Sequence, residues 1–164
     1  MVVAAAGAEE WALFLHLLGA FLLVAGAAVA AVAFEAARRR AEPREVALLL
    51  GLTRVGVGLV GLGGLLVLAF GLWLVDLEEI GYDAGWVDAA IGLYAAMAVA
   101  GALGGQRPKR ARKLASALAE RGESATAELR ALLDDRLALA ANYLSGALVA
   151  AIVVLMVFKP GGPS

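Results

Sequence analysis

The chain contains no cysteine, which excludes a secreted scaffold held together by disulfides. Charge is scarce as well: only 18% of the residues are charged, against about a quarter in an ordinary soluble domain. The formal net charge is -1, which argues against a nucleic-acid-binding protein, because such proteins carry an excess of basic residues. Zinc-ligand spacings, a nucleophile elbow and a phosphate-binding loop are also missing from the sequence. These absences leave no recognisable catalytic apparatus, and we predict that the protein is not an enzyme.

Hydrophobic residues are what the chain has in excess. They make up 62% of its 164 residues, and the mean hydropathy is +0.84. A chain this short has too much surface to cover with polar groups for that composition to suit a soluble or a disordered protein. The 20 glycines agree with this, because glycine is more frequent in membrane helices than in soluble ones. The composition therefore indicates an integral membrane protein.

Four apolar stretches are long enough to cross a membrane. A helix needs roughly 20 apolar residues to span about 30 Å of hydrocarbon. The stretches cover residues 11–34, 50–75, 86–104 and 137–158. Alternating strand patterns are absent, so helices are the means of satisfying the backbone in lipid. We predict an all-α fold, a four-transmembrane-helix bundle in which residues 1–164 form a single domain with a helical loop over residues 105–136.

Basic residues set the expected orientation. Thirteen of the fourteen Lys and Arg residues lie between the first and second stretches, early in the second stretch, or in the 105–136 loop. The opposite side has seven acidic residues and Lys159. Because basic loops stay in the cytoplasm, both termini are expected outside. Glu9 and Glu10 precede the first apolar stretch, so it is read as a retained span and not as a cleaved signal, which would begin with basic residues. Trp11, Trp73 and Trp86 all fall at the expected outer boundary of the membrane, as in an aromatic belt.

The 105–136 loop is predicted to form two short helices, with a break at Gly122-Glu123 and Ser124 as a candidate N-cap. Leu114, Ala117 and Leu118 fall on one face of the first helix, beside a run of basic residues. Those basic residues suffice to hold the loop inside, and they also suit contact with anionic lipid headgroups.

Glycines mark candidate surfaces for helix packing, because small residues let membrane helices approach closely. The candidates are Gly56, Gly58, Gly61, Gly63, Gly64, Gly101 and Gly105. Residues 56–61 also match the dinucleotide-binding fingerprint, but that motif needs a strand and a turn open to water. Within an apolar span the match is a false positive, and the glycines are expected to serve packing.

His16 is the only histidine, and it lies near the outer end of the first span. Asp88 and Met156 lie near the same boundary. A His–Asp pair can pass protons, and a histidine with a methionine can ligate haem iron or copper. The simpler interpretation, which we favour, is a neutral imidazole bonded to a hydroxyl or carbonyl group. No cofactor is predicted; haem or copper bound by His16 and Met156 is the alternative.

Three further polar residues lie within the spans. Arg54 can extend its side chain to the cytoplasmic headgroups, where Glu35 or Glu45 is expected to pair with it. Asn142 and Tyr143 near the start of the fourth span can form hydrogen bonds between helices or, with Arg54, line a polar path. We favour packing, because one polar helix face is little basis for a pore.

Two short stretches carry a resemblance. Leu15-His16-Leu17-Leu18-Gly19-Ala20 and Val154-Leu155-Met156-Val157-Phe158-Lys159-Pro160-Gly161 are similar to segments of bacterial predicted integral membrane proteins of domain-of-unknown-function family 2269. The early histidine also resembles that of the copper-resistance type D membrane proteins, although this chain lacks their further histidines. The first resemblance implies a small bacterial inner-membrane protein without an assigned activity.

These observations predict a structural, accessory or interaction role in the bacterial cytoplasmic membrane. The expected partners are the lipid bilayer, anionic headgroups, and a second copy of the chain or another membrane protein. A haem- or copper-binding protein for electron transfer or metal handling is the alternative, with His16 as ligand.

Overall fold

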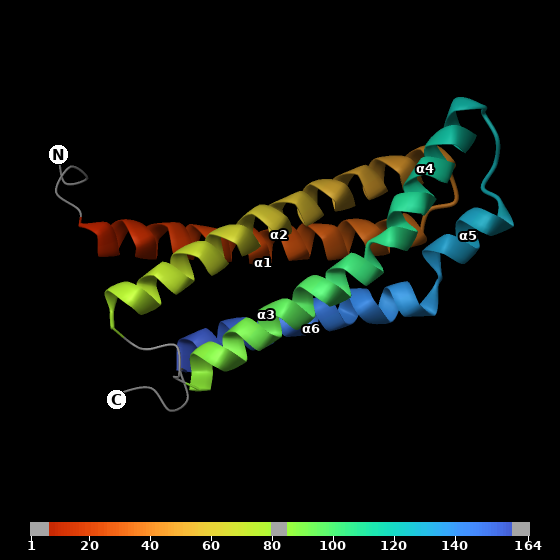
Figure 1. Ribbon diagram of the computed structural model, residues 1–164. Helices are drawn as coiled ribbons and strands as arrows, with labels where there is room; N and C mark the ends of the chain where they lie inside the picture. Colours follow the sequence, from red (N-terminus) through yellow and green to blue (C-terminus); the bar gives the residue numbers. More distant parts are fainter. Residues whose placement is uncertain (1–6, 80–84, 159–164) are drawn as a thin grey trace.

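The computed structural model of the protein describes residues 7–79 and 85–158, which form six α-helices and contain no strand. The helices are α1 (Ala8–Arg38), α2 (Pro43–Leu77), α3 (Gly85–Gly104), α4 (Gln106–Glu120), α5 (Ala127–Leu133) and α6 (Arg136–Phe158). α1 and α2 form one long hairpin, α3 and α6 pair with each other, and α4 and α5 connect α3 to α6 at one end (Figure 1). The predicted all-helical fold is confirmed, with four helices long and apolar enough to cross a membrane.

The two ends of the molecule differ in charge. α1 and α3 begin, and α2 and α6 finish, at the same end (Figure 1). We call it the acidic end, because its described charged residues are all carboxylates: Glu9, Glu10, Asp76, Glu78, Glu79 and Asp88. The opposite end, with α4, α5 and the α1–α2 connection, is called the basic end. Lys159 and Asp83 lie outside the described residues.

Glycines let α1 and α2 pack backbone against backbone. Gly19 and Gly26 of α1, and Gly56 and Gly63 of α2, are each two helical turns apart, so each pair shares a face. A Cβ atom on Gly56 would lie 2.6 Å from the Ala30 nitrogen and 2.7 Å from the Gly26 oxygen. A Cβ atom on Gly63 would lie 2.6 Å from the Gly19 oxygen. This face therefore has room for hydrogen atoms only, which is how membrane helices gain close contact.

The basic end has a core of its own. The 35 residues of α2 extend about 52 Å at 1.5 Å per residue, well beyond a hydrocarbon layer of about 30 Å. The core is built where α1 and α2 meet α4 and α5, from Phe34, Ala37, Val46, Leu50, Ala111, Ala115, Leu118, Leu129 and Leu133. The apolar face of α4 thus packs on the protein, with Leu118 buried and Leu114 partly buried. Lys109, Arg110 and Lys113 of α4 are exposed.

The loop helices were correctly expected, but the predicted N-cap was wrong. Thr126, and not Ser124, caps α5: its Oγ1 accepts a hydrogen bond of 3.3 Å from the Leu129 backbone nitrogen. Both residues carry a hydroxyl group. α5 begins at Ala127, and its residues Leu129 and Leu133, one turn apart, are buried in the core.

Arg130 of α5 caps the C-terminal end of α1. Its Nη1 donates to the backbone oxygen of Arg38 at 3.0 Å, and its Nη2 donates to that of Arg40. These carbonyls have no partner within α1, and a cation at a helix C-terminus is favoured by the helix dipole. Arg38 in turn forms ion pairs with Glu35 at 2.8 Å and with Asp134 at 3.0 Å. These hydrogen bonds and ion pairs together tie α1 to α5.

The α3–α6 pair packs against the α1–α2 hairpin through a second apolar cluster. Leu23 of α1 meets Met97 of α3 and Val149 and Ile152 of α6 there. α3 and α6 approach each other at Gly104, where a Cβ atom would lie 3.1 Å from the Cβ of Ala141. Beyond the Leu23 cluster, toward the acidic end, the helices enclose a cavity.

Candidate functional site: a pocket at the acidic end

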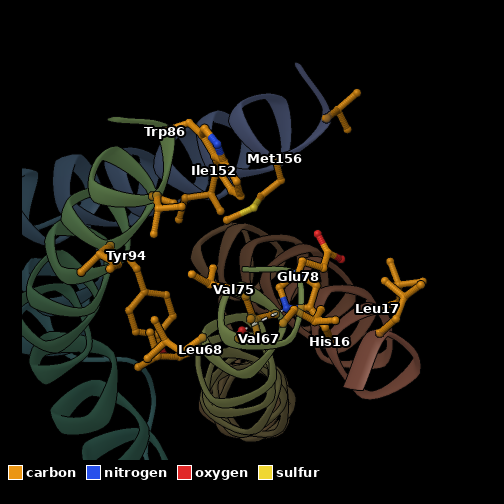
Figure 2. Close-up of a pocket in the computed structure, with 18 residues that line it drawn as sticks. His16, Leu17, Val67, Leu68, Val75, Glu78, Trp86, Tyr94, Ile152 and Met156 are labelled. Carbon is orange, nitrogen blue, oxygen red and sulfur yellow. Dashed lines mark hydrogen bonds between the residues drawn. The ribbon is translucent and has the colours of Figure 1, made fainter. Parts of the chain in front are cut away.

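The pocket lies between the α1–α2 hairpin and the α3–α6 pair, and its volume is about 310 Å³. Small-molecule sites in proteins begin at about 300 Å³. All four long helices line it, and Figure 2 shows side chains from each of them around the space. Its wall is mainly aliphatic, with His16 of α1, Glu78 at the end of α2, Trp86 and Tyr94 of α3, and Met156 of α6 as the remaining side chains of note.

His16 is positioned by a bond to the neighbouring helix. Its Nδ1 lies 3.0 Å from the backbone oxygen of Val67 in α2 (Figure 2). Since a carbonyl oxygen only accepts, this bond places the hydrogen of the imidazole on Nδ1. Gly71 makes the approach possible: it lies one turn after Val67, and a Cβ atom there would be 3.0 Å from Cε1 of His16. The favoured interpretation of His16, an imidazole bonded to a carbonyl, agrees with this contact.

The structure brings Met156 to the same pocket as His16 but leaves Asp88 outside it. Met156 lines the wall and packs partly against the clusters around Ile152 and Trp86. Asp88 is exposed in the first turn of α3 and is not part of the lining. The helical period explains the difference, because Trp86, Ala90 and Tyr94 recur on the inner face and Asp88 falls on the other side.

Tyr94 of α3 contacts α2 at the end of the pocket that lies nearer the middle of the helices. Its hydroxyl oxygen would lie 2.7 Å from a Cβ atom on Gly64 of α2, so the absence of a side chain at Gly64 admits the phenol ring. Trp86 is only 7% exposed and packs with Val75 and Val87, whereas Trp11 and Trp73 are each 42% exposed. The aromatic belt predicted for this boundary thus holds two outward-facing tryptophans, and the third closes one side of the pocket.

Arg54, Asn142 and Tyr143 are exposed and line neither this pocket nor the one described below for the basic end. The expected pairing of Arg54 with Glu35 or Glu45 is wrong for the described residues. Glu35 pairs with Arg38 and Arg39, and Glu45 lies 3.7 Å from Arg40. Arg38 at the end of α1, and Arg39 and Arg40 after it, form these pairs, whereas Arg54 lies further along α2.

The predicted packing glycines divide into two groups. Gly56 and Gly63 contact α1, and Gly64 contacts Tyr94. Gly58, Gly61 and Gly101 have no atom of the described chain within 4 Å of the position that a Cβ atom would take, so the prediction does not hold for them as contacts within the chain. A Cβ on Gly105 would meet only the Gly101 oxygen of its own turn, at 3.1 Å. Partner helices decide which face is used, and sequence spacing alone does not reveal the partner.

Sequence reasoning missed Glu78, Trp86, Tyr94 and Gly71 as parts of one site. The sequence did carry a signal for the contacts of Gly64 with Tyr94 and of Gly71 with His16. The two glycines are seven residues apart, so they share a face of α2. Among the described residues, no group of three or more His, Cys, Asp and Glu side chains is placed to hold a metal ion. The arrangement offers an apolar chamber with one oriented imidazole, one thioether and one carboxylate.

A second, polar pocket lies at the basic end between α4 and α5. It is lined by Arg107, Arg110 and Lys113 on one side and by Glu128 and Asp135 on the other. Arg107 and Asp135 are 3.6 Å apart, so its charges partly neutralise each other. The pocket at the acidic end is therefore the stronger candidate for a binding site.

Comparison with known proteins places the chain in a family. No curated protein matches it, and no solved structure does. The model of a family described as predicted integral membrane protein (DUF2269) matches residues 11–160, which include the apolar cores of all four membrane-crossing helices and the whole lining of the pocket. The chain belongs to this family of integral membrane proteins.

Proposed function

We propose that the protein is a non-catalytic binding protein with an accessory role in the bacterial cytoplasmic membrane, and that its site is the pocket at the acidic end. The observation that carries this is a chamber of about 310 Å³ with a mostly aliphatic wall built from four helices. Several lining residues also face outward: Leu13, Leu17, Ile91 and Val157 are 40–71% exposed, on surfaces that contact lipid in a membrane. A lipid-soluble molecule can therefore reach the chamber from the bilayer.

Adamantyl diazirine, a small neutral photolabel, tests this proposal on the full chain in detergent. Saturable labelling is expected, and mass spectrometry should map it to the α3 peptide that contains Trp86 and Tyr94. Ala90 lines the pocket at 6% exposure, whereas Ala89 beside it is exposed. Ala90→Leu should abolish saturable labelling and Ala89→Leu should leave it unchanged. Labelling that does not saturate, or that survives Ala90→Leu in a folded protein, would overturn the proposal.

A haem- or copper-binding protein is the second candidate. Two observations favour it: His16 and Met156 line the same pocket, and the backbone oxygen of Val67 supports the His16 ring at Nδ1. A carbonyl behind the ring is a common support for metal-binding histidines. Protein expressed with haem and copper supplied should then show a Soret band or bound copper that His16→Ala removes. A colourless, metal-free protein would exclude this candidate.

We further propose that both termini lie outside and that the basic end faces the cytoplasm. The support is the separation of charge, since every described Lys and Arg lies at the basic end or, for Arg54, on the basic-end half of α2. Reporter fusions at Gly122 and Ser164 test it, and an outside location of Gly122 would overturn it. The exposed cations of α4, Lys109, Arg110 and Lys113, support contact with anionic headgroups, which vesicle flotation with and without anionic lipid measures.

Self-association through α2 is the proposal for protein partners. Gly58 and Gly61 are exposed on α2 and have open space around them within one chain. Small residues of this kind allow a second helix to approach. Gly58→Leu should then shift the protein from dimer to monomer in detergent, and an unchanged mass would exclude this face.

A further inference from the structure

The pocket at the acidic end has a charge preference built into its rim. Its wall offers few polar groups, and the Nδ1 nitrogen of His16 is already bonded to the Val67 carbonyl. Glu78, which follows the last residue of α2, is the one charged residue among those that line the pocket in the described part of the chain. It is exposed, so its carboxylate lies at the mouth of an apolar chamber and not within it.

The surroundings of the mouth have the same sign. All described charged residues at the acidic end are carboxylates, and the described Lys and Arg residues are at or toward the opposite end. A mouth lined by one sign of charge beside low-dielectric walls raises the local concentration of the opposite charge. The aromatic rings of Trp86 and Tyr94 line the same chamber and suit the apolar body of a ligand.

We propose that the pocket binds an amphiphilic monocation. Its apolar body occupies the chamber between the α1–α2 hairpin and the α3–α6 pair, and its positive charge lies beside Glu78. This inference rests on the proposed binding function and adds the chemical class of the ligand. Three features of the described residues match such a molecule. The wall is aliphatic and aromatic, the volume of about 310 Å³ suits a small lipid-soluble body, and the charged lining residue is an acid at the rim.

Octyltrimethylammonium and octyl sulfate, used below their critical micelle concentrations, provide the test, because they have the same eight-carbon apolar chain and carry opposite charges at one end. Binding to the full chain in a non-ionic detergent is measured by equilibrium dialysis, with the Ala90→Leu protein in the same detergent as the blank. The cation is expected to bind at least about tenfold more tightly than the anion, since an attraction at the rim is replaced by a repulsion.

Glu78→Gln should weaken binding of the cation about fivefold, the upper range for an ion pair that remains in contact with water. Glu79→Gln is the matched control, because Glu79 is exposed at the same end but is not part of the lining. It removes the same charge and should leave the affinity within about twofold. A loss of equal size in both variants would mean that only diffuse charge acts, and it would overturn the role of Glu78.

The outcomes separate this inference from the proposed function. Saturable labelling by the neutral adamantyl diazirine together with equal affinity for the two ions leaves a binding pocket without charge preference, which overturns the inference alone. Tighter binding of the anion also overturns it. Absence of saturable labelling and of binding by either ion overturns both proposals.

Discussion

The close contact between α1 and α2 predicts that a larger side chain at Gly63 destabilises the protein. Replacing this glycine by alanine adds a Cβ atom 2.6 Å from the backbone oxygen of Gly19, where an ordinary contact needs at least 3.4 Å. The two helix backbones must then separate by about 0.8 Å along this line, because neither atom belongs to a side chain that can rotate away. Overpacking of a fixed contact costs about 1–3 kcal/mol. Gly63→Ala should therefore destabilise the hairpin by that amount relative to a control alanine.

Gly51→Ala is that control. It lies on the same helix, has no atom within 4 Å of the added Cβ, and gains the same helix propensity of about 1 kcal/mol. The free energy of unfolding of both variants and the wild type is measured by SDS titration in mixed micelles, followed by tryptophan fluorescence. The expected order is Gly51→Ala at or above wild type and Gly63→Ala below it. Equal unfolding midpoints for the two variants would refute the backbone contact between α1 and α2.

Two further substitutions test the ends of the molecule. Gly71→Ala places a Cβ atom 3.0 Å from the His16 ring, so the hydrogen bond between His16 and the Val67 carbonyl should lengthen or break. The ¹⁵N chemical shift of His16 Nδ1 is expected to change while the fold is retained. An unchanged shift would contradict the contact between Gly71 and His16. Arg130→Met removes two hydrogen bonds to carbonyls at the end of α1 and should cost about 1–3 kcal/mol. Arg121→Met loses an exposed hydrogen bond to the Ala117 carbonyl and an exposed ion pair with Glu123, and it should cost less than about 1 kcal/mol. Equal losses in these two variants, measured by SDS titration, would contradict the capping role of Arg130.

Hydropathy alone predicted the number of membrane-crossing helices, because the requirement to satisfy the backbone in lipid leaves little choice of structure. The same reasoning could not predict which helix faces meet. The glycines of α2 were recognised as packing residues, but the face in use is selected by Gly19 and Gly26 of α1, which lie at the matching heights. Gly58 and Gly61 have the same residue type and lack such partners among the described residues.

The candidate site was predictable only in part. His16 and Met156 were both assigned to the outer boundary, and their depth in the spans does place them in one pocket. Asp88 has a similar depth in the membrane but lies on a different face of α3. The sequence indicated the depth of each residue and not which face of α3 lines the pocket, so it could not distinguish Asp88 from Trp86 and Ala90. The pocket itself depends on how the α1–α2 hairpin and the α3–α6 pair are spaced, and the hydrophobic pattern of a single helix does not predict that spacing.

The contrast between the two ends explains why the pocket lies where it does. At the basic end, Leu118 of α4 and Leu129 and Leu133 of α5 pack against the α1–α2 hairpin, and Arg130 ties α5 to α1. At the acidic end, Tyr94 and Trp86 of α3 pack against α2, Met156 of α6 lines the same space, and the pocket lies between these side chains. A ligand that fills this space would supply the contacts that α4 and α5 supply at the basic end, so binding should raise the stability of the acidic end selectively. Hydrogen exchange of the α3 amides near Ala90 should slow on binding, while exchange near Leu118 should not change.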